Sequence, residues 1–376
     1  MSITKDIFWC NNCLNMSTRP RLTFDEHGWC SACQWMKEKQ TLDWEKRLRE
    51  LEKLLDKYRS KNAGFDCIVP VSGGKDGSYI AYKLKHEYGM NPLTVTSRPP
   101  LELPLGERNL LNFVRSGYDH LHVTANEHSM RIINKQGLIE KGFPYYGWLI
   151  SIFSIVIRTA LYFRIPLIIY AEDGEVEYGG SKENKYTPIF NIDYMRRAYF
   201  EAGYEKVLDA SGLSDQELYW FKLPDQAELN KADIFLTHWS YFEPWDPYRN
   251  YLIAKEHCGL EEAECSNSGT FTNFAQNDQA LYALHTYLMY LKFGFGRATQ
   301  DAGIEIRRGA MTRAQAVNLV KLYDGHYPEE FMDLYLNYYQ MTREEFDALL
   351  DRWVNKDLFV NRNGRWEPNF SIDHLS

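Results

Sequence analysis

The chain has 376 residues, of which 44% are hydrophobic, 25% charged and 15% aromatic, and 43 Lys and Arg against 51 Asp and Glu give a net charge of −8. This composition excludes a disordered or collagen-like chain, and the length allows two domains or one large domain with an appendage. The acidic balance argues against binding nucleic acid through bulk charge, because neutralising phosphates requires an excess of Lys and Arg. We therefore expect a small-molecule substrate and no nucleic-acid partner.

No segment is expected to direct export or to span a membrane. The sequence starts with Met1-Ser2-Ile3-Thr4-Lys5-Asp6, and no apolar stretch of signal-peptide length is found there. The most apolar window, 148–171, contains two arginines and a proline, so its charge-free runs are too short to cross a bilayer. It predicts a buried helix over 150–162 followed by a buried strand over 166–170. We expect a cytoplasmic protein without a membrane partner.

Paired cysteines mark the first segment, 1–36. Four of the seven cysteines lie here as two Cys-x₂-Cys pairs, Cys10, Cys13, Cys30 and Cys33. The spacing is typical of a four-cysteine zinc ribbon, in which each pair brings two thiolates to one tetrahedral ion. A redox pair is the alternative, but two matched arms favour a closed structural zinc site.

A charged segment, 37–61, follows the cysteines. Four of its residues recur at helical spacing: Leu48, Leu51, Leu55 and Tyr58. This periodicity predicts a linking helix over 37–64, ended by Asn62, Ala63 and Gly64. Its basic residues are expected to form a solvated face.

Strands and helices alternate from residue 65 to about 180. Strands are predicted over 66–71, 92–96, 120–123 and 166–170, and helices over 78–88 and 109–116. The alternation indicates an α/β fold with a doubly wound parallel sheet covered on both faces. We place this domain at 65–240 and a mainly helical region, which would complete the substrate site, at 241–376.

A glycine-rich turn after the first predicted strand is the most informative stretch of the chain. It reads Ser72-Gly73-Gly74-Lys75-Asp76-Gly77-Ser78. The glycines let consecutive N–H groups face an anion, and the following helix adds its positive end. The serines and Lys75 are suited to phosphate oxygens, whereas Asp76 is suited to Mg²⁺ or to orienting the turn. The pattern is neither a Walker loop nor a Rossmann motif, and a turn that only connects strand and helix is the alternative.

Acidic residues crowd the loop after the fourth predicted strand, at the edge where doubly wound sheets bind ligands. Their mutual repulsion favours Mg²⁺ or a cationic group nearby, and a solvated acidic loop is the alternative. Glu175 and Glu177 are candidates for binding such a group. After the second strand, Gly106 and Asn109 are candidates for lining the ligand pocket, which is an adenosine pocket if the ligand is ATP.

Two arginines beside glycines, Arg297 and Arg307, have a spacing that suits a clamp on phosphates or a carboxylate. Ion pairing with Asp301 and Glu305 is the alternative, and the sequence favours neither.

The glycine-rich turn resembles the PP-loop signature, Ser-Gly-Gly-x-Asp-Ser, of the ATP pyrophosphatases, with Gly77 inserted before Ser78. The paired cysteines, Gly-Glu-Val-Glu-Tyr-Gly-Gly at 174–180, Phe-Gly-Arg-x₃-Asp at 295–301 and Arg-x-Gly-x₂-Thr-Arg at 307–313 add a closer likeness. With them the chain resembles the N-acetyl sugar amidotransferases, the WbpG and PseA proteins of surface-polysaccharide and flagellar-glycan synthesis.

This resemblance implies an ATP- and Mg²⁺-dependent enzyme that converts the N-acetyl group of a nucleotide-activated sugar to an acetamidino group and releases AMP and pyrophosphate. Four residues are the expected catalytic set, the last two as metal or ammonia-site residues: Lys75, Asp76, Glu175 and Glu177. The expected ATP-binding residues are Ser72, Gly73, Gly74, Lys75, Asp76, Gly77, Ser78, Gly106, Asn109, Arg297 and Arg307.

The ammonia is expected to come from a separate triad-type glutaminase. An N-terminal cysteine nucleophile is absent, since position 2 is Ser2, and Cys67, Cys258 and Cys265 lack an elbow pattern with a histidine partner. The aromatic stretch 241–245 is a candidate docking surface, with burial in the chain's own core as the alternative.

Two other functions fit parts of the sequence. A tRNA sulfur-transfer enzyme also joins a PP-loop to Cys-x₂-Cys arms, but it requires a basic tRNA-binding face and usually further catalytic cysteines near the ATP site. A non-catalytic zinc-bearing scaffold is the other alternative.

Overall fold

The structure is a computed structural model that describes residues 7–61, 64–201 and 203–375. The opening residues 1–6, with Ser2, lie outside this range, as do Asn62 and Ala63, where the linking helix was expected to end.

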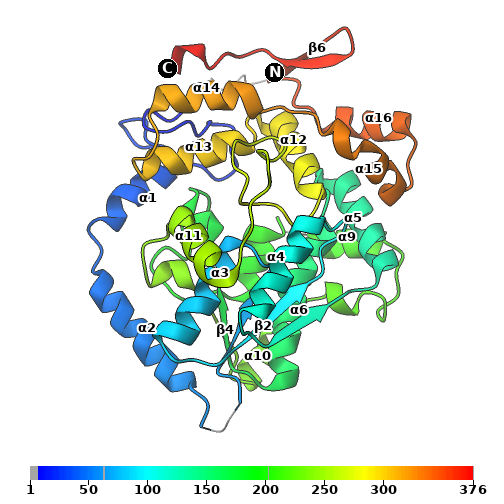
Figure 1. Ribbon diagram of the computed structural model, residues 1–376. Helices are drawn as coiled ribbons and strands as arrows, with labels where there is room; N and C mark the ends of the chain where they lie inside the picture. Colours follow the sequence, from blue (N-terminus) through cyan, green and yellow to red (C-terminus); the bar gives the residue numbers. More distant parts are fainter. Residues whose placement is uncertain (1–6, 62–63, 202, 376) are drawn as a thin grey trace.

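Five parallel strands form the central sheet (Figure 1). In sheet order they are β3 (His120–Val123), β2 (Pro92–Ser97), β1 (Cys67–Pro70), β4 (Leu167–Tyr170) and β5 (Phe235–His238). Every neighbouring pair is parallel, and the register places Ile68 opposite Ile168. The predicted doubly wound α/β fold is confirmed, with β5 as an additional strand at one edge.

Alternate residues of β1 and β4 enter two separate cores, one on each face of the sheet. Ile68 and Ile168 pack with α6 (Tyr146–Phe163) in the larger core. On the other face, Val69 and Ile169 pack with α2 (Trp44–Tyr58), α3 (Lys75–Tyr82) and α4 (Pro104–Arg115). Because both faces are covered, the strands are continuous apolar runs, as expected for a buried parallel sheet.

Helix α6 is a core helix. Among the described residues it is the one helix long and apolar enough to cross a membrane, but 67% of that window is buried inside the protein. It packs against β1, β2 and β4, so its apolarity is explained by burial on both sides. This confirms the predicted buried helix, which begins at Tyr146, before the expected start at residue 150.

The prediction of one long linking helix is wrong. The segment forms α1 (Ser31–Lys39) and α2, separated at 40–43. The break arises because Asp43 caps α2, accepting a hydrogen bond from the backbone N of Lys46 at 2.8 Å. The predicted stripe of α2 is confirmed, since Leu51 and Leu55 are buried in the second core.

The remaining elements complete the two layers and the C-terminal region. Between the strands lie η1 (Lys83–Glu87), α5 (Glu127–Lys141), α7 (Gly174–Glu177), α8 (Ile192–Tyr194), η2 (Met195–Tyr199), α9 (Tyr204–Ala210), η3 (Tyr219–Phe221) and α10 (Gln226–Lys231). After β5 follow η4 (Trp239–Tyr241), α11 (Pro247–Cys258), α12 (Leu281–Phe293), α13 (Arg297–Arg307), α14 (Arg313–Tyr323), η5 (Glu329–Phe331), α15 (Met332–Tyr339), α16 (Arg343–Trp353), β6 (Phe359–Arg362), β7 (Arg365–Pro368) and η6 (Asp373–Leu375).

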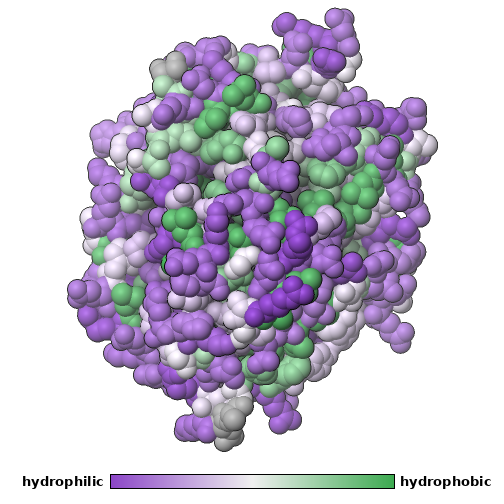
Figure 2. All heavy atoms as spheres, in the orientation of Figure 1, coloured by the Kyte–Doolittle hydropathy of each residue, from purple (hydrophilic) through white to green (hydrophobic). Residues whose placement is uncertain are grey.

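The C-terminal helices gather at one end of the molecule, where α13 lies near α1 (Figure 1). They share cores with the rest of the chain: α12, α15 and α16 contribute to the core of α6, and α11 packs on α3. Hydrophilic residues cover most of the face shown in Figure 2, with hydrophobic residues in small patches. The helical region is therefore packed onto the sheet domain.

Candidate functional site

The glycine-rich turn joins β1 to α3 and is held tightly by its neighbours. Gly73 has a φ of +79°, and a Cβ atom there would lie 2.4 Å from the backbone N of Leu110, so only glycine fits. Gly74 is the N-cap of α3, which therefore begins at Lys75 and not near residue 78 as predicted. Lys75 and Asp76 consequently lie in the first helical turn, beside the positive end of the helix.

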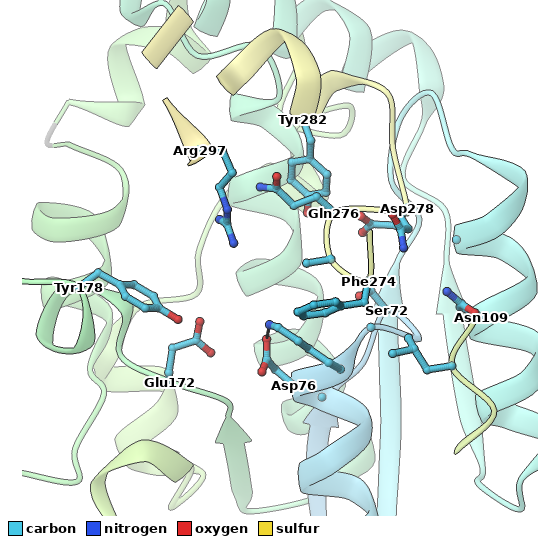
Figure 3. Close-up of a pocket in the computed structure, with 17 residues that line it drawn as sticks. Ser72, Asp76, Asn109, Glu172, Tyr178, Phe274, Gln276, Asp278, Tyr282 and Arg297 are labelled. Atoms are coloured by element: carbon cyan, nitrogen blue, oxygen red, sulfur yellow. Dashed lines mark hydrogen bonds and ion pairs between the residues drawn. The ribbon is translucent and has the colours of Figure 1, made fainter. Parts of the chain in front are cut away.

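A cavity of about 260 Å³ opens over this turn (Figure 3). Its walls come from five parts of the chain: Ser72, Gly74, Lys75, Asp76 and Gly77; Gly106 and Asn109 of α4; Glu172 and Tyr178 beyond β4; Leu260, Phe274, Ala275, Gln276, Asn277, Asp278 and Tyr282; and Arg297. Figure 3 shows Arg297 and Tyr282 pointing into the cavity from the helical region, opposite Glu172 and Asp76. The position beside β1 and β4 is the switch point of the sheet, where doubly wound folds bind ligands.

Lys75 and Asp76 form an ion pair at the base of the cavity. The second oxygen of Asp76, Oδ1, accepts a hydrogen bond from Nδ2 of Asn250 in α11 at 3.0 Å. The carboxylate is thereby fixed between two elements before any ligand binds. Neither Lys75 nor Asp76 is more than partly exposed, so both charges act in a sheltered site.

Ser78 does not line the cavity. Because α3 starts at Lys75, Ser78 lies one turn into the helix, where it is fully buried and its hydroxyl has no hydrogen-bond partner. Its carbonyl oxygen lies 3.8 Å from the Sγ of Cys258, which donates to it. The residues that face the cavity are those from Ser72 to Gly77, with Gly73 supplying the bend.

Glu172 is the carboxylate of the acidic loop that faces the cavity, and the sequence analysis did not single it out. It follows β4 directly, and Figure 3 shows it across from Asp76. Burial and the negative charge of Asp76 raise the pKa of Glu172 to about 8, although Lys75 opposes this effect.

Glu175 and Glu177, the expected metal or ammonia-site residues, lie outside this cavity. Glu175 forms two hydrogen bonds with Arg21, at 2.6 and 2.7 Å. Glu177 accepts from Nζ of Lys39 at 2.6 Å and from Nε1 of Trp35 at 3.0 Å. Both carboxylates therefore bind the N-terminal segment, and the structure gives them a role in docking it.

The two candidates in α4 line the cavity as expected, but within the helix and not at its start. A Cβ atom on Gly106 would lie 2.4 Å from Cα of Asp278, so the absent side chain lets the 274–278 loop approach. The amide of Asn109 is occupied by the backbone of Glu261, with bonds of 2.8 and 3.0 Å. Asn109 thus positions a wall of the cavity.

The two arginines of α13 have different environments. Arg297 lines the cavity while its Nε donates to Asp301 at 2.8 Å, so the ion pair with Asp301 is present and a role as phosphate ligand stays a prediction. Arg307, ten residues further along the helix, does not line this cavity and faces a second one. The structure therefore does not place Arg307 with the other expected ATP ligands.

Polar residues that the sequence analysis did not single out also line the cavity, among them Tyr178 of the 174–180 motif, Asp278 and Tyr282. Burial raises the pKa of Asp278 to about 7. The hydroxyl of Tyr178 stays protonated well beyond its usual range, because burial and the charges of Glu172 and Asp76 raise its pKa. These groups offer hydrogen-bond donors at neutral pH.

The four N-terminal cysteines converge as predicted. Their sulfur atoms all lie within 4.8 Å of one another, with Cys10 and Cys33 separated by 3.8 Å and Cys13 and Cys30 by 3.6 Å. A tetrahedral ion with metal–sulfur bonds of about 2.3 Å requires sulfur–sulfur distances of about 3.8 Å. All four side chains are buried, so the arrangement fits a structural zinc ion.

N–H groups surround the sulfur atoms, as they do around metal-bound thiolates. The side-chain amide of Asn12 donates to Cys33 at 3.3 Å, and that of Asn15 donates to Cys30 at 3.3 Å. The backbone N of Cys30 donates to Cys10 at 3.1 Å. These bonds stabilise negative charge on sulfur, which favours metal binding over a redox pair.

The aromatic stretch 241–245 is buried in the core around α3. Phe242 and Trp245 are 1% and 7% exposed, and Glu243 accepts hydrogen bonds from Tyr79 and from Arg249. Burial, the alternative to a docking surface, therefore accounts for these residues.

The carboxyl group of Glu172 predicts a pH-dependent stability of the ligand-free protein. Because its pKa is about 8 in the folded chain against 4.5 ordinarily, the folded state holds a proton that the unfolded state releases, and stability falls as pH rises between these values. Glu172→Gln removes the cost of ionising this buried carboxyl group. The free energy of unfolding of the variant should therefore exceed that of the wild type by about zero at pH 4 and by about 1–2 kcal/mol at pH 9. Urea unfolding at several pH values measures it, with the exposed Glu107→Gln as control; a gain independent of pH contradicts the assignment.

Comparison with known proteins gives one family match. Residues 268–371 match the family described as "LPS biosynthesis protein WbpG-like, C-terminal domain". A solved structure, a predicted subunit of a tRNA methyltransferase from Methanocaldococcus jannaschii, is similar at 15% identity and a TM-score of 0.25, over 64% of this chain and 90% of that chain. No curated protein matches.

Proposed function

Since the chain carries the C-terminal domain of the WbpG-like proteins beside a PP-loop turn, we propose that it is an ATP-dependent N-acetyl sugar amidotransferase of glycan biosynthesis, in the lipopolysaccharide O-antigen or flagellar-glycan branch. One observation carries the proposal. The WbpG-like domain contributes Asp278, Tyr282 and Arg297 to the same cavity that the PP-loop turn lines. The two parts thus meet at a single site suited to two substrates.

The reaction exchanges the oxygen of an acetamide for nitrogen. Because an amide oxygen is a poor leaving group, it first attacks the α-phosphate of ATP, which breaks the α–β bond and releases pyrophosphate. Ammonia then adds to the carbon of the adenylated imidate, loses a proton, and AMP departs with the former amide oxygen. The products are the acetamidino sugar, AMP and pyrophosphate.

The chain's own groups support the first step through positioning and charge. The turn and the first residues of α3 line the cavity, so the positive N-terminal end of this helix lies beside it, and Lys75 adds a positive charge for the departing pyrophosphate. Arg297, held by Asp301, approaches from the opposite wall. Tyr178 is a protonated donor near Glu172 in this cavity.

Mg²⁺ fits the two carboxylates of the cavity. Asp76 and Glu172 both line it, and burial together with the negative charge of Asp76 raises the pKa of Glu172. These two residues would hold the ion, which neutralises charge on the phosphates when bound. We also propose that the four cysteines hold zinc, with no part in the chemistry.

Ammonia comes, in this proposal, from a separate triad-type glutaminase. No cysteine is among the residues that line the cavity. Cys67 and Cys258 are buried, and burial raises the pKa of both thiols, to about 11 for Cys258, which makes them poor nucleophiles. The same observations weigh against tRNA sulfur transfer, which usually requires further reactive cysteines at the ATP site.

Mass spectrometry tests the proposed reaction. The protein is incubated with ATP, Mg²⁺, ammonium and each of a panel of UDP- and CMP-linked N-acetyl sugars. One sugar should yield a product about one mass unit lighter, with AMP formed in equal amount. AMP formation that depends on tRNA, or no AMP with any sugar, contradicts the proposal and supports a thiolation enzyme or a scaffold respectively.

A further inference from the structure

A second cavity of about 380 Å³ lies next to the first, and Tyr178 lines both. Its other walls come from α1, the start of α2, Glu177 at the end of α7, the 244–247 segment and the C-terminal end of α13. Three aromatic rings face it, those of Trp44, Tyr178 and Trp245. The proposed reaction of the first cavity leaves this space without a role.

The second cavity combines flat apolar surfaces with cations. Lys39 and Arg308 line it, and both are paired with carboxylates. Glu177 lies 2.6 Å from Lys39, whereas Arg308 has Glu305 at 2.6 Å and Asp246 at 3.6 Å. Arg307 is the third cation of the lining. Glu177 and Asp246 belong to the lining as well, so the cations outnumber the carboxylates there by one. Indole rings and guanidinium groups in one site are suited to an aromatic base linked to phosphate.

Two N–H donors of the lining residues have no acceptor. Trp245 is 7% exposed and its Nε1 has no hydrogen-bond partner, and Nη1 of Arg307 also has none. A buried donor without an acceptor costs stability, and such groups are rare in folded proteins. The indole of Trp44, in contrast, is fixed by its own bond to the carbonyl of Lys39 at 2.8 Å.

Helix α13 connects the two cavities. Arg297 at its start lines the first, and Arg307 at its end lines the second. Ten residues of α-helix span about 15 Å, which is comparable to an extended nucleotide sugar measured from its base to its amide. The first cavity has α4 on one side and Tyr178 on the other. If the adenosine of ATP binds against α4, the side at Tyr178 is left for the acetamide of the second substrate.

We propose that the second cavity binds the nucleotide of the nucleotide-activated sugar. The base lies against Trp44 and Trp245, the phosphates face Arg307 and Arg308, and the sugar extends past Tyr178 so that its acetamide enters the first cavity. The identity of this ligand rests on the proposed function, whereas the chemistry of the cavity requires only an aromatic base with phosphate.

Calorimetric titration of the full-length protein without ATP tests the site, with UDP, CMP and UDP-N-acetylglucosamine as probes. At least one nucleotide should bind, and Trp44→Ala and Arg308→Ala should each weaken it about tenfold. Arg343→Ala is the control, because Arg343 on α16 pairs with Glu329 and Asp347 and does not line the second cavity. This variant should bind the nucleotide as the wild type does. Melting curves identify any variant that fails to fold, and Trp44→Phe should recover most of the affinity.

Lys75→Ala distinguishes binding at the two cavities. It should weaken the binding of ATP in the first cavity and leave the binding of UDP, CMP or UDP-N-acetylglucosamine in the second unchanged. The inference is overturned if none of the probes binds, if both variants bind as the wild type does, or if Lys75→Ala abolishes the binding. Tight binding without any acetamidino product refutes the proposed function and leaves this site standing. Product formation with the sugar's KM unchanged in folded Trp44→Ala and Arg308→Ala refutes the site and leaves the function standing.

Discussion

Replacing Lys75 by alanine is expected to lower kcat for amidine formation by about 10²–10³-fold, the usual effect of removing one group that stabilises developing charge. Lys75 lies in the first turn of α3, faces the cavity and is nearly sheltered from solvent. Its charge is therefore close to the departing pyrophosphate in the proposed reaction. Steady-state measurement of AMP and of amidine gives the effect.

Lys83→Ala is a matched control for this variant. Lys83 follows α3 directly, has a similar exposure and forms an ion pair with Glu87, but it does not line the cavity. It should keep nearly full activity. A Lys75→Ala enzyme within threefold of the wild type would show that the turn does not act on phosphate.

Removal of the ion expected at the four cysteines should have the largest effect on stability. Cys13→Ser, or treatment with a strong chelator, is expected to lower Tm by roughly 5–10 °C, because metal binding contributes directly to folding free energy. The wild type should contain one zinc per chain by elemental analysis. Cys265→Ser, which changes an exposed cysteine outside the cluster, should alter neither zinc content nor Tm.

The same removal should also weaken ATP binding, because the N-terminal segment holds the loop beyond β4. Ser31 donates to the carbonyl of Gly179 at 2.6 Å, and a Cβ atom on Gly179 would lie 2.7 Å from the backbone N of Ala32. Together with the bonds of Arg21 and Lys39, these contacts fix the loop that carries Glu172 and Tyr178. Loss of zinc with unchanged Tm and ATP affinity would contradict this account.

The sheet was largely predictable because buried parallel strands are apolar runs, and β1 to β4 appear within one or two residues of their expected bounds. Strand β5 was missed because its four residues end in Thr237 and His238, which read as polar although both are buried. The break before α2 was missed because charged, helix-forming residues flank the uncharged residues 40–42 on both sides, and Asp43 was not recognised as a cap.

The turn of the candidate site was predictable from its glycines, but the choice among neighbouring residues was not. Glu172 precedes the short helix α7 and faces the cavity. Glu175 and Glu177 lie within α7, which directs both of them to the N-terminal segment. Arg297 and Arg307 lie at the two ends of one helix, and they line different cavities because that helix extends from the first cavity to the second. Such differences depend on packing between distant segments, which a local pattern does not encode.

The fate of the acetamide oxygen tests the central claim most directly. A substrate labelled with ¹⁸O in its N-acetyl carbonyl is turned over with ATP and ammonium, and the nucleotide and phosphate products are separated and weighed by mass spectrometry. The account predicts that one ¹⁸O atom appears in AMP and none in pyrophosphate. Label in orthophosphate with ADP as its companion, or label only in water, would contradict it.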